Sequence, residues 1–351
     1  MQYRSKVLTA AASVAVAAST FIGLGVASAS SPPKPPPENA APTIPVLPGS
    51  GKGLILGYIN FGETAGPFIN AVEDSIEKEA KISGATLEVC DAHSTAEDAV
   101  ACARNFKLEH VQAYLNFQPV SAAAPAVCAA GPKVPVIAID IHQPPCETAF
   151  MGTNNAYAGW LGGVGVGQYV KSHFNCQYDA FVSLADAAVG PVNGERMGGY
   201  LDGFESICGT VPSSKLINIE NSGSTDPTLP VFTDVLTRLP DAHRIIAVGI
   251  NDESVEGAID AARTANRLSD IYVSGQGLDN SAYCLLKTDP HWIGDTAYFP
   301  EHYGLVGVPY LIKLAKGQKV PKLLYVHDEF VTSSNIAMYY GPEVAHCPAF
   351  H

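Results

Sequence analysis

The sequence predicts an α/β protein made of two similar lobes, each a doubly wound parallel sheet. Short apolar runs without alternation, such as residues 245–248, are typical of strands that are buried on both faces. Each run is followed by apolar residues at helical spacing, and regular strand–helix alternation produces right-handed parallel units. The alternation occurs in two sets, at residues 54–139 and 180–298, which predicts two lobes.

In the first set, strands are expected at residues 54–61, 87–90, 111–117 and 134–139. Pro67 and Gly84 suit the first turn and the C-cap of the helix between the first two strands. Ser94 and Glu97 have the spacing of a capping box, so the next helix is expected to begin there. An alanine-rich helix follows the third strand.

The second set begins with a long helix opened by residues 153–155, in which Trp160 and Tyr169 are expected to pack rather than to bind ligand. Its strands are expected at residues 180–184, 216–219, 245–250, 271–273 and 293–298, and its helices at 193–207 and 227–239. A helix near residues 303–315 and a strand near 323–326 follow this set. We expect both to return to the first lobe, whose sheet would otherwise be short.

The N-terminus has the pattern of a cleavable signal peptide at residues 1–29. Arg4 and Lys6 precede an apolar stretch, residues 7–26, and Ala-Ser-Ala at 27–29 fits the cleavage rule. The stretch is also long enough for an uncleaved anchor, an alternative that the sequence leaves open. Residues 30–52 are rich in proline and predict a semi-rigid linker. We therefore expect an exported protein, either periplasmic or in the cell envelope or medium.

The cysteines and the charge exclude several classes of protein. All eight cysteines follow the signal segment, and an even count in an exported chain indicates disulfides. Eight cysteines allow about 105 pairings. We expect the sequential one, which is Cys90–Cys102, Cys128–Cys146, Cys176–Cys208 and Cys284–Cys347. The cysteine and histidine spacings predict no metal site, and the formal net charge of −13 argues against nucleic acid.

Polar residues follow several of the predicted strands, and ligands of parallel sheets bind at the carboxyl ends of the strands. These residues, with two nearby aromatic ones, are Asn116 or Gln118, Asp140, Thr153, Asn155, Asn251, Tyr298, Phe61 and Phe68. Amides and carboxylates hydrogen-bond hydroxyl groups, and aromatic faces cover the C–H side of a sugar ring. The set predicts a site for a neutral, polyhydroxylated ligand. Asn251 could also serve as a helix N-cap. Arg196 at the head of a helix could form a surface ion pair or direct its five N–H donors into the crevice.

Several motifs occur in a fixed order: Gly-Tyr-Ile-Asn-Phe, Gly-Pro-Phe, Ile-Ala-Ile-Asp, Thr-Asn-Asn, Glu-Arg-Met-Gly-Gly-Tyr and Ile-Asn-Asp-Glu-Ser-Val-Glu-Gly-Ala. Over residues 53–332 the chain resembles the ribose/galactose type of periplasmic sugar-binding protein, whose two-lobe fold is shared with LacI-type repressors. The resemblance implies ligand contacts from Phe68, Gln118, Asp140, Thr153, Asn155, Arg196, Asn251 and Tyr298.

The resemblance also implies a hinge of three crossovers, near Thr153, Phe299 and residues 327–329, that closes the lobes around the ligand. The N-terminal lobe is then expected at residues 53–152 plus 299–327. The C-terminal lobe is expected at residues 153–298 plus 328–341, followed by a tail at 342–351.

The chain departs from the ribose binders at several of their ligand positions. Ile141 replaces an arginine, Ile69 replaces an aromatic residue, Gly66 replaces an asparagine, and residues 275–277 read Gly-Gln-Gly where an aspartate is expected. These changes argue against ribose and favour another sugar, a polyol or a less polar metabolite. The candidates for replacement contacts are Phe61, Glu63, His142 and Gln276.

We therefore expect a monomeric binding protein, without cofactor, that captures a small neutral sugar or polyol and delivers it to a membrane ABC permease. A sensor that presents its ligand to a membrane receptor and a sugar-acting enzyme are the alternatives. The sequence lacks GxSxG and HExxH, which argues against an enzyme. A repressor would need a helix-turn-helix where the signal-like segment stands.

Overall fold

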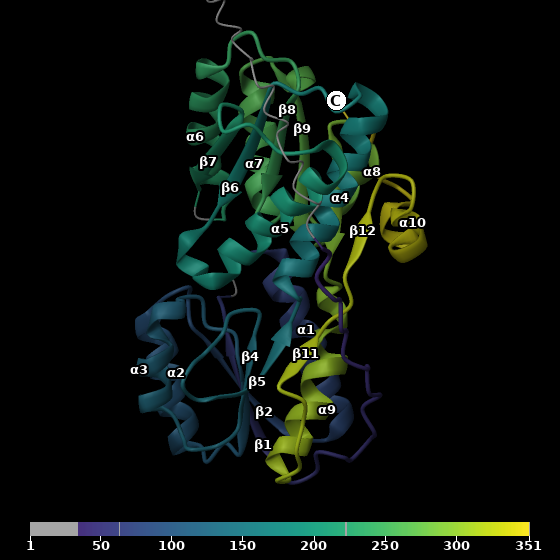
Figure 1. Cartoon of the computed structure of the whole chain (residues 1–351). Helices are drawn as coiled ribbons and strands as arrows, with labels where there is room; N and C mark the ends of the chain where they lie inside the picture. The colour runs from purple at the N-terminus through teal and green to yellow at the C-terminus, as the bar shows by residue number, and fades with distance from the viewer. Residues whose placement is uncertain (1–33, 63, 222, 351) are drawn as a thin grey trace, which may run out of the picture. The chain divides into compact units, whose positions relative to one another are not determined.

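The computed structural model describes residues 34–62, 64–221 and 223–350, and the expected signal segment lies outside these residues. The described chain contains two six-stranded sheets with helices on both faces of each (Figure 1). This arrangement confirms the predicted fold class. No helix among the described residues is both long enough and apolar enough to span a membrane.

The first sheet is parallel, in the order β11-β5-β4-β3-β1-β2. Its strands are β1 (Ile55–Asn60), β2 (Thr86–Asp91), β3 (Ala113–Asn116), β4 (Val136–Ile139), β5 (Glu147–Gly152) and β11 (Leu323–Tyr325). One face is covered by α1 (Pro67–Ser83) and α9 (Tyr303–Ala315), and the other by α2 (Ala96–Leu108) and α3 (Ala124–Ala130). The return of α9 and β11 to this sheet is as predicted.

The second sheet repeats this order as β12-β10-β9-β8-β6-β7. Its strands are β6 (Ala180–Ala185), β7 (Leu216–Glu220), β8 (Ile245–Gly249), β9 (Ile271–Gly277), β10 (Trp292–Ala297) and the antiparallel β12 (Glu329–Val331). Its helices are α4 (Asn155–Phe174), α5 (Pro191–Cys208), α6 (Thr225–Arg238), α7 (Asp252–Thr264), α8 (Ala282–Thr288), α10 (Ile336–Tyr339) and α11 (Gly341–Val344). Short 3-10 turns are η1 (Ser121–Ala123), η2 (Ala187–Val189), η3 (Leu268–Asp270) and η4 (Pro300–His302).

The chain crosses between the sheets three times, after β5, β10 and β11. In each sheet the chain order reverses beside the first strand of the set, which lies between the second and the third. Such a reversal leaves a crevice at the carboxyl ends of the strands, where ligands bind in this type of sheet.

Some elements differ from the sequence prediction. The second helix begins one residue later than the predicted capping box, because Thr95, not Ser94, accepts the hydrogen bond from the Asp98 amide at 3.1 Å. Ser94 has a left-handed φ of 56°, which is outside the usual N-cap geometry. Strand β5 and helix α8 were not expected, since β5 starts with the polar residues Glu147 and Thr148 and α8 has only seven residues.

Four disulfides join Cys90 to Cys102, Cys128 to Cys146, Cys176 to Cys208 and Cys284 to Cys347. This is the sequential pairing that the sequence analysis predicts.

The proline-rich segment packs more closely than a simple linker. The Ala41 amide donates to the Tyr325 carbonyl at 2.7 Å, and Ile44 and Val46 pack against the first core.

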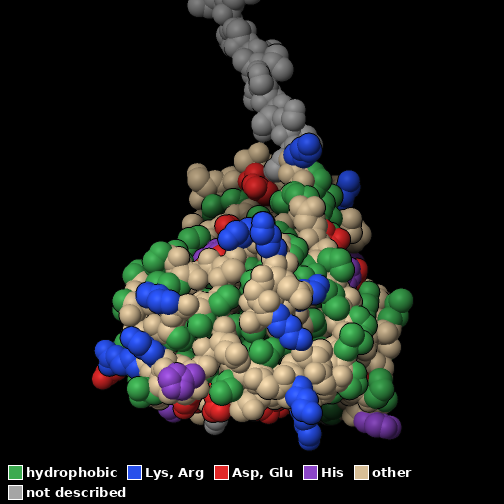
Figure 2. All heavy atoms as spheres, turned by 90° about the horizontal axis from the view of Figure 1, so that it is seen from below, with side chains coloured by type: hydrophobic (Ala, Val, Ile, Leu, Met, Phe, Trp, Pro, Cys, Tyr) green, Lys and Arg blue, Asp and Glu red, His purple; other side chains and the backbone are tan. Residues whose placement is uncertain are grey.

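Figure 2 shows one face of the molecule, on which Lys and Arg side chains are scattered among apolar and polar ones.

Candidate ligand-binding site

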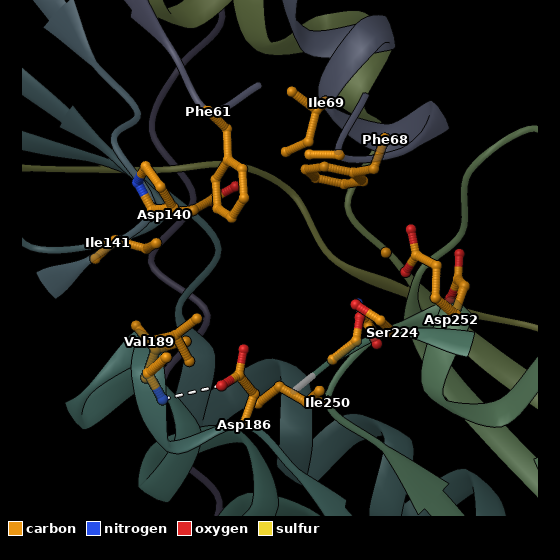
Figure 3. Close-up of a pocket in the computed structure, with 18 of the residues that line it drawn as sticks. Phe61, Phe68, Ile69, Asp140, Ile141, Asp186, Val189, Ser224, Ile250 and Asp252 are labelled. Carbon is orange, nitrogen blue, oxygen red and sulfur yellow. Dashed lines mark hydrogen bonds between the residues drawn. The ribbon is translucent and has the colours of Figure 1, made fainter. Parts of the chain in front are cut away.

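A cavity of about 470 Å³ lies at the carboxyl ends of the strands and is lined by residues of both sheets' connections. This volume is in the range of small-molecule sites. Figure 3 shows Phe61, Phe68 and Ile69 on one side of the cavity and Asp186, Val189 and Ile250 on the opposite side.

The aromatic part of the cavity comes from the loop after β1 and the start of α1. The ring of Phe68 makes edge contacts with the rings of Tyr298 and Tyr303, at centroid distances of 6.2 and 5.8 Å. The ring of Phe61 is held in the same way by Phe117, at 5.5 Å. These contacts fix apolar ring surfaces at the cavity wall, where they can cover the apolar face of a ligand.

Asp140 follows β4 and is buried at the cavity wall. Its carboxylate accepts hydrogen bonds from the hydroxyl of Tyr303 at 2.9 and 3.2 Å. Burial raises the pKa of Asp140 to about 6, although the Arg196 charge and the Tyr303 hydrogen bond oppose this rise. Gly152 makes room for the carboxylate, since a Cβ there would lie 2.2 Å from Oδ1 of Asp140.

Arg196 is the only basic residue among the described residues that line the cavity. Its Nε donates to Oδ1 of Asn155 at 2.7 Å, and Nη1 donates to the Ile250 carbonyl at 3.1 Å. The guanidinium lies 5.0 Å from the ring centroid of Tyr298. Arg196 is placed by close packing of α4 and α5, because a Cβ on Gly159 would lie only 2.1 Å from the Arg196 carbonyl oxygen.

The amides Asn251 and Gln276 also line the cavity, but both have partners within the protein. Asn251 caps α7, accepting from the amide and hydroxyl of Ser254 at 3.1 and 2.6 Å, and its Nδ2 donates to the Gly223 carbonyl. Oε1 of Gln276 accepts from the hydroxyl of Tyr298 at 2.6 Å. The structure therefore shows the capping role of Asn251 at the edge of the cavity.

Of the sequence-predicted residues, Phe61, Phe68, Asp140, Arg196, Asn251, Gln276 and Tyr298 line the cavity. Gln118, Thr153, Asn155 and His142 are not among its lining residues, and Glu63 lies outside the described residues.

The residues outside the lining have other contacts. Nε2 of Gln118 donates to the Val120 carbonyl at 2.8 Å, within the loop after β3. The hydroxyl of Thr153 donates to Asp328 at 2.7 Å and so links two of the crossovers. Nδ1 of His142 lies 3.0 Å from the Glu147 carboxylate.

Sequence reasoning missed a group of carboxylates that also lines the cavity, namely Asp186, Asp252, Glu253 and Asp279. Asp252 and Glu253 directly follow Asn251, where acidic residues are common simply because they suit a helix N-terminus. Asp279 lies two residues beyond the stretch 275–277, where the resemblance to the ribose binders leads one to expect an aspartate. Burial, reinforced by the Asp279 charge, raises the pKa of Glu253 to about 8. No group of three or more His, Cys, Asp or Glu residues in the described chain is arranged to hold a metal ion.

Two doubly wound lobes, three crossovers and a cavity at the strand ends define a two-lobe binding protein. The family model of the periplasmic binding protein domain matches residues 57–319, and the chain belongs to this family. This places it in a class of binding proteins rather than of enzymes. No curated protein sequence matches the chain.

Several solved structures share the fold. An ABC transporter solute binding protein from Mycobacterium smegmatis with bound glycerol has a TM-score of 0.70 and 18% identity, covering 81% of this chain and 96% of that one. One from Bacillus halodurans C-125 with bound myo-inositol has a TM-score of 0.69 and 18% identity, covering 83% and 98%. One from Actinobacillus succinogenes 130z with bound D-allose has a TM-score of 0.67 and 18% identity, covering 82% and 100%.

Proposed function

We propose that this protein captures a small hydroxylated ligand, a sugar or a polyol, between its lobes and delivers it to a membrane permease of the ABC type. The observation that carries the proposal is the cavity that both lobes line. Support comes from the ABC transporter proteins of the same fold with bound glycerol, myo-inositol and D-allose.

In this proposal the ligand contacts come from Asp140, Arg196 and the aromatic rings of Phe61, Phe68 and Tyr298. Asp140 accepts hydrogen bonds from hydroxyl groups, and Arg196 donates them. The rings cover the apolar side of the ligand. Three further predicted residues act as positioning residues. Gln118 holds the loop after β3, Thr153 links two crossovers of the hinge, and Asn155 holds Arg196.

The proposal extends to the whole chain. Residues 1–29 are removed as a signal peptide, and the mature protein works as a monomer with the lobe boundaries expected from the sequence. Ligand binding brings the lobes together by rotation at the three crossovers, and the permease recognises that form.

A thermal-shift screen against pentoses, hexoses and polyols tests the proposal, because a ligand bound only by the folded state raises the melting temperature. At least one compound is expected to raise it in proportion to the logarithm of its concentration. Arg196→Ala is expected to abolish the shift, whereas Arg104→Ala, which changes an exposed arginine on α2, is expected to keep it. If no compound of the panel raised the melting temperature, or if the shift were unchanged in Arg196→Ala, the proposal would be contradicted.

A further inference from the structure

The part of the cavity next to α7 is lined by carboxyl groups, and that of Asp279 has unused acceptor capacity. Asp252 and Asp279 are only 2% and 1% exposed. In each, one oxygen is used within the protein: Asp252 Oδ2 accepts from the Asp279 amide at 2.9 Å, and Asp279 Oδ1 accepts from the Ser281 amide at 2.8 Å. Oδ2 of Asp279 has no hydrogen-bond partner, whereas the carboxyl group of Asp252 forms a side-chain hydrogen bond with that of Asp295.

Further acidic groups surround these two. A Cβ on Gly275 would lie 2.5 Å from Oδ2 of Asp295 and 2.8 Å from Oδ1 of Asp252, so these two carboxyl groups converge above Gly275. Glu253 extends from α7 toward α1, because a Cβ on Gly66 would lie 2.7 Å from its Oε1. Burial together with the neighbouring carboxylates raises the pKa of Asp252 and of Glu253. Clustering without a cation therefore disfavours their charged forms.

Arg196, the basic residue that lines the cavity, does not neutralise the charge of the carboxylates next to α7. The Nε and Nη1 atoms of Arg196 each donate to a protein partner, Asn155 and the Ile250 carbonyl. The charge of Arg196 acts on Asp140 and Asp328. The Nδ2 of Asn251 donates to Gly223. Once deprotonated, the carboxylates at this end of the cavity offer more acceptors than the protein supplies donors, an imbalance that suits a ligand group with donors only. An ammonium group is such a group, since it has three N–H donors and no acceptor.

An aromatic face accompanies the carboxylates. A Cβ on Gly277 would lie 3.4 Å from the ring of Phe68 and 3.7 Å from Oδ2 of Asp252, so the space left by this glycine is bordered by a ring and a carboxylate. In Figure 3 Phe68 lies at the top and Asp252 at the right of the view, and the two residues come from different lobes. Carboxylates and aromatic faces both attract ammonium groups. A metal ion fits less well, since the described residues contain no metal-binding group of three or more.

We propose that the ligand carries a protonated amine, which binds between Asp279, Asp252 and the ring of Phe68. This inference rests on the proposed function and narrows the ligand to an aminated sugar or amino-polyol. The hydroxyl groups of the ligand face Asp140 and Arg196, and its ammonium group faces α7.

Titration calorimetry with matched ligands at pH 6.5 tests the inference. The sets are glucose, glucosamine and N-acetylglucosamine, the same three forms of galactose, and sorbitol with 1-amino-1-deoxysorbitol. Cyclohexylamine serves as an amine without hydroxyl groups. We expect an aminated member to bind about tenfold or more tightly than its hydroxyl and N-acetyl counterparts, the ratio for one charge-assisted hydrogen bond.

The variant Asp279→Asn is expected to reduce this ratio to near one. The control Asp241→Asn removes an exposed carboxylate of the same lobe and is expected to keep the ratio.

The outcomes separate this inference from the proposed function. A hydroxyl compound that binds as tightly as its aminated counterpart overturns the inference and leaves the proposed function intact. Cyclohexylamine binding as tightly as the aminated sugars supports the ammonium site and contradicts sugar or polyol capture. A panel in which nothing binds overturns both.

Discussion

The guanidinium of Arg196 is held by the side-chain oxygen of Asn155, at an Nε–Oδ1 distance of 2.7 Å. Asn155 is the first residue of α4 and directly follows the first crossover. Through this hydrogen bond the position of the only described basic residue lining the cavity depends on the start of the second lobe.

The variant Asn155→Ala is expected to weaken ligand binding about tenfold, because Nε of Arg196 loses its partner and the guanidinium its orientation. Asn155→Asp keeps an acceptor at the same place and is expected to bind nearly as well as the wild type. Calorimetry with the strongest ligand of the screen measures both. Equal affinity in the alanine variant would show that this hydrogen bond does not position Arg196.

The capping role of Asn251 predicts a loss of stability. Asn251→Ala removes the acceptor of the Ser254 hydrogen bonds and is expected to lower the free energy of unfolding by about 1 kcal/mol. Asn251→Asp, which keeps the cap, is expected to cost less. Urea unfolding without ligand measures the difference, and an alanine variant as stable as the aspartate variant would exclude the cap as a source of stability.

The contact between α4 and α5 predicts opposite effects for two glycine substitutions. Gly159→Ala places a Cβ against the Arg196 carbonyl oxygen and is expected to destabilise the protein by about 1–3 kcal/mol. Gly198→Ala lies on α5 with nothing within 4 Å of the added Cβ, and it is expected to stabilise by up to about 1 kcal/mol. Thermal unfolding of the two variants, compared with wild type, checks the sign of each change.

The buried carboxyl groups predict that stability falls as pH rises. Burial raises the pKa of Asp140 to about 6 and of Glu253 to about 8, and the hydrogen bond to Glu147 raises that of His142. Between pH 5 and 8 the folded state therefore binds more protons than the unfolded state. The stabilisation is present at low pH and is lost as pH rises through these values.

Urea unfolding of the ligand-free protein is expected to give a lower free energy at pH 8 than at pH 5. Glu253→Gln, which cannot ionise, is expected to reduce this difference, whereas Asp241→Asn at an exposed position is expected to leave it unchanged. A free energy that rises from pH 5 to pH 8 would contradict the assignment.

The fold followed from the sequence because several buried strands, such as β4 and β8, are unbroken apolar runs. The return of β11 to the first sheet followed from the shortness of that sheet. Strand β5 lacks such a run and was missed. Position at a strand end placed Asp140 and Tyr298 at the cavity, but it did not give the direction of the Gln118 side chain, which is turned into its own loop. The carboxylates of Asp252 and Asp279 were missed because only tertiary packing brings them together.

The most direct test of the central claim is a crystal structure of the protein with the tightest ligand from the screen. The account predicts one ligand molecule in the cavity between the lobes, within hydrogen-bond distance of Asp140 and Arg196 and against the ring of Phe68. A ligand bound outside this cavity, with Asp140 and Arg196 untouched, would contradict it.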